Sequence, residues 1–170
     1  FQVNNLHSGG ADGFAFLIQN TSATAIGNGS GGCTLGYDGI ADSVAIEFDT
    51  YQTTGACIGS SNTNDPDGNH ISVHTLGTLA NTVSESASIG TYSPPATIDN
   101  GAVHTVRVEY VPGTLRVYYD NLTTPVITAP LVLNTLLSLT SGGQAWLGFT
   151  AATGGANEQH DILSWSFTPS

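Results

Sequence analysis

Two carboxylates in the stretch 44–51, VAIEFDTY, have the spacing of a metal site or of a hydrolytic acid pair. Because side chains alternate between the two faces of a strand, Glu47, Asp49 and Tyr51 would share one face, with the two carboxylates about 7 Å apart. Two neighbouring carboxylates raise each other's pKa and weaken the fold. A proton or a cation is therefore expected between them.

A second group of oxygen donors follows at 64–69, NDPDGN, and leads directly into His70. Carboxylate and amide oxygens suit calcium, whereas the histidine nitrogen suits a transition metal. An isolated pair such as Glu47 and Asp49 would be read as a solvated strand face. The adjoining turn and His70 favour a metal site, with Asp65 as a further ligand and Asp67 as a turn former.

Hydrolysis of a glycosidic bond is the alternative chemistry for such a strand. Some glycosidases with a β-sandwich fold carry three carboxylates at alternate positions of one strand, and retaining enzymes need two of them about 5 Å apart. The third alternate position here holds Tyr51. The sequence therefore predicts a protein that is not an enzyme, with a glycosidase remnant using Glu47 and Asp49 as the weaker alternative.

The elements that must position these residues are short β-rich runs separated by Gly, Pro, Asn and Asp. This pattern predicts an all-β fold, an antiparallel β-sandwich or jelly roll. Pro112 and Gly113 indicate a hairpin turn. Val106 and Val108 are expected to face the core. The segment 131–139 fits a short helix or a strand equally well. The expected strands are 13–18, 43–51, 70–75, 104–111, 114–119, 145–150 and 161–167, with Trp146 and Trp165 in the core.

Composition limits the partners. The 170 residues fit one domain, 1–170, and they include two basic side chains, Arg107 and Arg116, against a formal net charge of −11. Such a chain repels phosphate backbones, so nucleic acid is not expected as a partner. No apolar run reaches the roughly 18 residues of a membrane span, so membrane insertion is not expected either.

Several features indicate an extracellular or cell-surface protein. The chain is rich in Thr, Ser and Gly, lacks lysine, and has two cysteines, Cys33 and Cys57, which could form one disulfide or remain as buried thiols. Residues 1–4, FQVN, resemble the middle of a strand. An additional segment, another chain or a homo-oligomer would then complete the sheet. Sequons occur at Asn20, Asn28 and Asn121.

Six strings taken in order carry a resemblance to the L-type lectins, the legume-lectin group with a concanavalin-like jelly roll, and the style of the loops is closest to bacterial members. The strings cover nearly the whole chain: 10–16 (GADGFAF), 34–37 (TLGY), 47–51 (EFDTY), Asp65-Pro66 with His70-Ile71, 147–154 (LGFTAATG) and 160–167 (HDILSWSF). The resemblance implies carbohydrate binding to glycans or glycoconjugates, organised by a Ca²⁺ ion and a Mn²⁺ or similar transition-metal ion.

The resemblance also implies the metal ligands. Glu47, Asp49, Asp65 and His70 would hold the transition metal. Calcium would share Asp49 and Asp65 and add the backbone carbonyl of Tyr51.

Sugar-binding residues follow from the same resemblance. Asp12, preceded by a cis Ala11–Asp12 peptide, would accept two sugar hydroxyls over the ring of Tyr51. Backbone amides near Gly32 and at Gly155 and Ala156 would complete the pocket.

This chain departs from the family at Thr53, where an asparagine normally binds both calcium and sugar. Asn62 or Asn64 could enter the site instead, from a longer loop. A disulfide between Cys33 and Cys57 would tie the Gly-rich loop to that metal loop. The departure at Thr53 leaves a second hypothesis open, namely a structural or adhesive sandwich that has lost sugar binding.

Overall fold

The fold is built from antiparallel strands with little helix. The computed structural model describes residues 1–4, 9–57, 62–139 and 143–169. Three short helical turns accompany the strands: η1 (Gly32–Thr34), η2 (Glu85–Ala87) and α1 (Leu133–Leu136). The strands are β1 (Gln2–Asn4), β2 (Gly13–Gln19), β3 (Ser43–Asp49), β4 (His70–His74), β5 (Ser88–Tyr92), β6 (Asn100–Val103), β7 (Val106–Val111), β8 (Thr114–Tyr119), β9 (Ile127–Ala129), β10 (Trp146–Ala152) and β11 (Gln159–Asp161).

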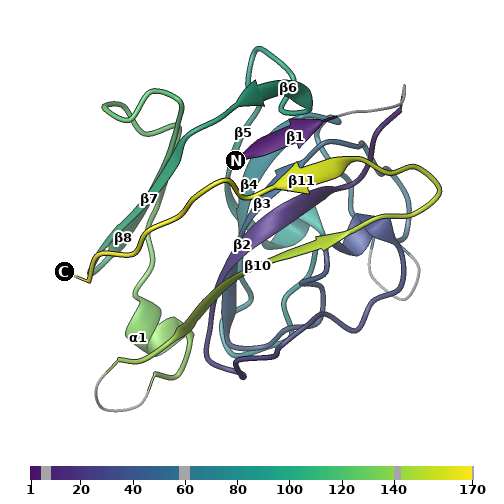
Figure 1. The fold of residues 1–170 in the computed structure, drawn as a ribbon. Coiled ribbons are helices and arrows are strands. Elements are labelled where there is room, and N and C mark those ends of the chain that lie inside the picture. Colours follow the sequence, from purple (N-terminus) through teal and green to yellow (C-terminus); the bar gives the residue numbers. More distant parts are fainter. Residues whose placement is uncertain (5–8, 58–61, 140–142, 170) are drawn as a thin grey trace.

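Three sheets organise these strands, and the largest has the order β10-β2-β3-β4-β5 (Figure 1). The other two sheets have the orders β11-β1-β6 and β7-β8-β9. Every pairing between the named strands is antiparallel. The all-β sandwich predicted from the sequence is therefore confirmed.

The central strands β3 and β4 of the five-stranded sheet are buried on both faces. On β2, Phe14 and Ile18 join a core cluster that also contains Leu115 and Val117 of β8, so this face packs toward the β7-β8-β9 sheet. The alternate residues, including Leu17, join a second cluster with Tyr37. Strand alternation thus directs one face to the sandwich core and the other to a layer of loops.

The hairpin expected around Pro112 and Gly113 joins β7 to β8, with Val111 opposite Thr114. Gly113 has a φ of 97°, a left-handed conformation that glycine adopts without a steric penalty. Val106 and Val108 are half-buried against the main core, as predicted.

The C-terminal segment differs from its prediction. A strand was expected over 161–167, but β11 ends at Asp161, and the chain after it continues without strand pairing in the part that the structure describes (Figure 1). Trp165 is 57% exposed and Trp146 of β10 is 52% exposed, so the prediction that both tryptophans lie in the core is wrong. Alternation alone cannot bury a side chain, because burial also requires a second layer over it.

Two further predictions are refined. The 131–139 segment contains the single-turn helix α1, and β9 lies just before it. β3 ends at Asp49, two residues earlier than expected, so Tyr51 lies in the following loop. Among the described residues, no helix is both long and apolar enough to span a membrane.

Candidate metal and ligand site

Glu47 and Asp49 lie on the loop-covered face of the five-stranded sheet. They alternate with Ile46 and Phe48, which belong to the sandwich core, and Glu47 is 2% and Asp49 6% exposed. β4 pairs with β3 so that His70 lies opposite Asp49 and Ser72 lies opposite Glu47. The shared face predicted from alternation is thus present, and the register of β4 brings His70 to it.

At the Asp49 end of this face, carboxylates face one another. Ligand atoms of Asp49, Asp65 and His70 all lie within 4.8 Å of one another. Burial, and next the charge of Glu47, raise the pKa of Asp49 well above its ordinary value. Burial also raises the pKa of Asp65 to about 6, although a hydrogen bond from the Thr53 amide opposes the shift. The side chains around these two carboxylates therefore do not supply enough positive charge to balance them.

At the Glu47 end, histidines face carboxylates. Burial would raise the pKa of Glu47, but contacts with His74 and His70 outweigh it and lower that pKa to about 2. Burial would lower the histidine pKa values, but the carboxylates of Glu47 and Glu85 raise them to about 11 for His70 and about 10 for His74. This end of the cluster is balanced by its own charges.

Two members of this cluster were missed by sequence reasoning. His74 and Glu85 are not among the site residues predicted from the sequence, yet His74 is fully buried and lies 3.2 Å from the Glu85 carboxylate. The spacing of His70, Ser72 and His74 on one strand contained the signal for His74, because alternate residues share a face. Glu85 lies in η2, which no local pattern connects to the site.

The donor set fits divalent cations. Two groups of ligand atoms lie close enough to hold an ion, Asp49 with Asp65 and His70, and Glu47 with His70 and Glu85. Nε2 of His70 is buried and has no hydrogen-bond partner, an arrangement that native proteins rarely leave unexplained. Carboxylate oxygens suit calcium, and an imidazole nitrogen suits a transition metal.

Asp12 lies beside this cluster, on the loop that enters β2. Its peptide bond with Ala11 is cis, and its carbonyl accepts a hydrogen bond of 3.0 Å from the Thr50 amide, directly after β3. A Cβ atom at Gly32 would overlap the Asp12 carboxylate and would lie 2.6 Å from the Gly154 amide nitrogen. Glycine at position 32 thus allows three loops to meet around the Asp12 side chain.

The electrostatics of Asp12 resemble those of Asp65. Burial, and next the charge of Glu158, raise the pKa of Asp12 to about 6. Glu158 itself accepts a hydrogen bond from Thr50 Oγ1 and is paired with His160 at 2.9 Å. A partly enclosed carboxylate with few cationic neighbours is suited to accept donors from a polar ligand.

The remaining predicted residues lie in the loop after β3 and in the loop after β10. Tyr51 is 47% exposed, and its amide donates to Asp49 Oδ1 at 2.8 Å. Thr53 is half-buried, and its amide donates to Asp65 Oδ2 at 2.6 Å. Gly155 is exposed and Ala156 half-buried, directly after Gly154, while Asn62 and Asn64 are exposed.

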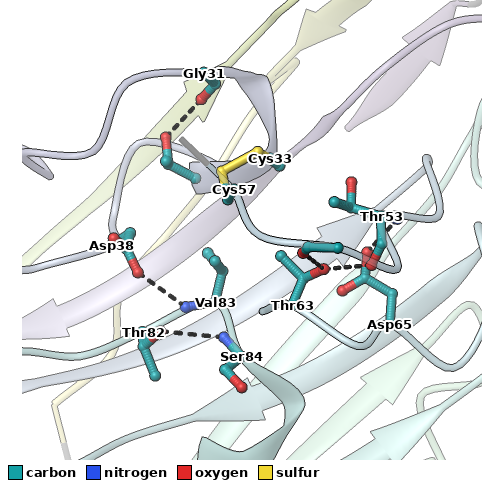
Figure 2. Close-up of a disulfide and its surroundings, with 12 residues drawn as sticks. Gly31, Cys33, Asp38, Thr53, Cys57, Thr63, Asp65, Thr82, Val83 and Ser84 are labelled. Atoms are coloured by element: carbon teal, nitrogen blue, oxygen red, sulfur yellow. Dashed lines mark hydrogen bonds between the residues drawn. A yellow bond between two sulfur atoms is a disulfide. The ribbon is translucent and has the colours of Figure 1, made fainter. Parts of the chain in front are cut away.

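A disulfide between Cys33 and Cys57 joins η1 to the loop that follows β3 (Figure 2). The expected pairing is therefore present in the structure. In the same view, Thr63 and Asp65 lie next to Thr53 on the returning arm of that loop (Figure 2). The disulfide thus ties the loop bearing Gly32, beside Asp12, to the loop bearing Thr53, beside Asp65.

Comparisons of the sequence with known proteins match this chain to one family. The sequence profile described as the legume lectin domain matches residues 1–170. The basic agglutinin of Psophocarpus tetragonolobus is 32% identical over 94% of this chain and 62% of its own length, and the seed lectin of Styphnolobium japonicum is 31% identical over 93% and 50%. The chain thus spans about half to three fifths of the length of these relatives. Both are plant proteins, so they do not test the likeness of the loops to bacterial members.

A solved structure gives the same result at the level of the fold. The crystal structure of basic winged bean lectin with Tn-antigen superposes with a TM-score of 0.62 and 27% identity, covering 92% of this chain and 62% of that one. The chain belongs to the legume lectin domain family.

Proposed function

We propose that this chain binds carbohydrate without catalysis, at the pocket centred on Asp12. The observation that carries the proposal is the enclosure of the Asp12 carboxylate between Gly32 and Gly154, with the loop after β3 beside it. An ionised carboxylate in such a pocket accepts two hydroxyl hydrogen bonds, which are charge-assisted. The basic winged bean lectin was crystallised with Tn-antigen, and that ligand of a relative supports a glycan as the ligand class here.

The other pocket residues would supply complementary contacts. The exposed ring of Tyr51 offers an apolar platform for one face of a sugar ring. Backbone amides at Gly32, Gly155 and Ala156 would donate to sugar oxygens, and the absence of side chains at the two glycines leaves the backbone accessible.

Metal ions would hold the pocket in place. Calcium is proposed to bind Asp49, Asp65 and the backbone carbonyl of Tyr51, and the family resemblance adds a transition metal such as Mn²⁺ on Glu47, Asp49, Asp65 and His70. A cation at Asp49 and Asp65 would stabilise the ionised form of both carboxylates, whose pKa values are raised chiefly by burial. It would also fix the chain between Asp49 and Thr53, and hence the position of Tyr51.

A second candidate is a lectin-like sandwich that has lost sugar binding. Thr53 favours it, because its side chain lacks the amide donor of the family's asparagine and its backbone amide is already engaged by Asp65. Catalysis is disfavoured by burial, because Glu47 is 2% exposed and its Oε2 accepts a hydrogen bond from the Tyr37 hydroxyl.

An extracellular or cell-surface location fits this function. The disulfide, the lack of lysine and the strongly acidic composition support it. Glycans or glycoconjugates are the proposed partners.

The decisive test of the pocket is a glycan array read with Asp12→Asn. The substitution preserves shape but removes the charge and turns one acceptor into a donor, so binding should fall at least about tenfold, or about 1.5 kcal/mol. Asp120→Asn, at a half-exposed carboxylate paired with His104, is the matched control and should bind like wild type. Unchanged binding by Asp12→Asn would place the ligand elsewhere on the surface.

Thr53→Asn separates the two candidates. If wild type binds glycans, the proposed function stands. If wild type retains none in calcium and Thr53→Asn gains binding, the chain is a lectin fold that has lost its ligand.

A further inference from the structure

Three Asn-x-Ser/Thr sequons, at Asn20, Asn28 and Asn121, take no part in the proposed glycan pocket or metal cluster. In a chain that passes through a eukaryotic secretory route, the asparagine of such a sequon is the acceptor for an N-linked glycan. The motif alone does not distinguish the three asparagines. Their side-chain amides have different surroundings in the structure, and this difference decides which of them can carry a glycan in the folded protein.

Asn121 lies in the turn that joins β8 to β9. Residues 121–124 are all exposed, and the chain leaves β8 through Asp120, which has a left-handed φ of 56°. This turn extends from the β7-β8-β9 sheet, which packs against the core face of the five-stranded sheet, whereas the metal cluster lies on the opposite, loop-covered face. A bulky group at Asn121 would therefore meet solvent.

Hydrogen bonds within the turn fix the orientation of the Asn121 amide. The backbone nitrogen of Thr123 lies 3.0 Å from Asn121 Oδ1, and the Thr123 hydroxyl lies 2.7 Å from the same atom. A backbone N–H can only donate, so the atom that faces it must be the carbonyl oxygen. Nδ2, the atom to which an N-linked glycan is attached, lies on the other side of Cγ and has no hydrogen bond to any residue that the structure describes.

Asn20 has the opposite arrangement. It is half-buried directly after β2, and its Nδ2 donates to the carbonyl oxygens of Leu137 at 3.0 Å and Ser138 at 3.2 Å. Both hydrogens of this nitrogen are therefore used to hold the segment that follows α1. A sugar on Nδ2 would replace one of these hydrogens and would separate the two segments.

Asn28 is exposed, but its amide lies against the backbone of Gly39. A Cβ atom at Gly39 would lie 2.2 Å from Asn28 Oδ1 and 3.2 Å from Asn28 Nδ2. A glycan on this nitrogen would require the amide to leave Gly39. Asn121 is thus the sequon whose acceptor nitrogen is both exposed and clear of other parts of the described chain.

We propose that Asn121 is the N-glycosylation site of this chain and that Asn20 stays unmodified in the folded protein. The co-substrate is a lipid-linked oligosaccharide diphosphate. A bond forms between Nδ2 of Asn121 and C1 of the first sugar, the bond between that carbon and the diphosphate oxygen breaks, and the proton displaced from Nδ2 goes to the released lipid diphosphate. The inference rests on the proposed extracellular location and is independent of glycan binding at Asp12.

The native structure selects among modified chains, because glycans are transferred before folding is complete. A glycan at Asn121 changes no contact within the described part of the chain, so chains modified there fold normally. A glycan at Asn20 removes a half-buried hydrogen bond and inserts bulk between β2 and the segment after α1. Chains modified at Asn20 are therefore expected to be retained in the cell rather than secreted.

The test is the full chain secreted from cultured eukaryotic cells, with intact mass and peptide mapping as readouts. Enzymatic removal of N-glycans in isotopically labelled water marks each formerly glycosylated asparagine as a labelled aspartate. Secreted wild type should carry the mass of one oligosaccharide, mapped to Asn121. Asn121→Gln and Thr123→Val should lose that mass, whereas Thr123→Ser, which keeps the sequon, should retain it.

Asn20→Gln is the matched control, because it removes a sequon that should be empty, and its secreted protein should carry the same glycan as wild type. Secreted wild type without a glycan at Asn121, while a second secreted glycoprotein of the same cells is modified, would overturn the inference. A glycan mapped to Asn20 or Asn28 of the secreted protein would overturn it as well. Because Asn121 and Thr123 are exposed, their variants are expected to fold normally.

Glycan binding is measured separately, on the array. A chain that is modified at Asn121 but retains no glycan ligand would refute the proposed function alone. A chain that binds glycans but is secreted without modification at Asn121 would refute this inference alone.

Discussion

Glu47 and Asp49 are two residues apart on the same strand and the same face, yet their surroundings shift their pKa values in opposite directions. Contacts with His74 and His70 lower the pKa of Glu47 to about 2 despite its burial. Burial and the charge of Glu47 raise the pKa of Asp49 well above its ordinary value. The histidine end can balance itself with protons, whereas the aspartate end depends on a cation from solution.

Removing divalent cations should have the largest effect. Chelation leaves Asp49 and Asp65 as uncompensated neighbours, so the melting temperature should fall by about 10 °C, the loss expected for an ion bound near a thousand times its dissociation constant. Differential scanning calorimetry in EDTA, and again after adding calcium, measures the change. An unchanged melting temperature after verified metal removal would mean that the aspartate end needs no cation.

Loss of the disulfide should have the next largest effect. Cys33 and Cys57 are separated by 24 residues, and closing a loop of this size stabilises the folded state by about 3 kcal/mol. Cys57→Ser should lower the free energy of unfolding by about that amount in a urea titration. Mass spectrometry of the unreduced wild type should find no alkylatable thiol, and finding two would remove the cross-link between the loops.

A change of pH should alter the melting temperature of the chelated protein less than chelation or loss of the disulfide does. The folded pKa values of Asp12 and Asp65, about 6 against an ordinary 3.8, mean that their contribution to stability is lost as pH rises from about 4 to 6. Those of His70 and His74, about 11 and 10 against 6.5, mean a further loss above pH 6.5. Glu47 is ionised in both states above pH 5 and adds nothing to this window.

The chelated protein should therefore melt about 5 °C higher at pH 5 than at pH 7.5. Calcium should reverse the order, because it binds the ionised carboxylates. Thermal melts at the two pH values, with and without calcium, check both statements. Equal melting temperatures of the chelated protein at both values would show that folding does not raise the pKa values of these groups as described.

Sequence reasoning predicted those parts of the site that depend on strand alternation and on a single turn. The face shared by Glu47 and Asp49 follows from local periodicity, whereas the placement of His70 opposite Asp49 depends on the register of β4. The pairing of Cys33 with Cys57 was expected from the count of two cysteines and from the extracellular type of composition. The roles assigned to Asp12, Thr53, Gly155 and Ala156 remain predictions.

The misses have one physical cause, which is that burial depends on what packs over an element. His74 is buried because η2 and the loop before it cover β4, and Glu85 reaches the site through the Ser72 hydroxyl rather than through any sequence pattern. Trp165 alternates like a strand residue but has no second layer over it and is exposed. Local patterns predict which residues share a face but not which face is covered.

Calcium-dependent retention of glycans on an array tests the central claim most directly. The account predicts that wild type in calcium retains a set of glycans, loses them in EDTA and recovers them when calcium is restored, because the cation at Asp49 and Asp65 fixes the loop that carries Tyr51 beside Asp12. Retention of the same glycans in EDTA after verified metal removal, or retention of none in calcium, would contradict it.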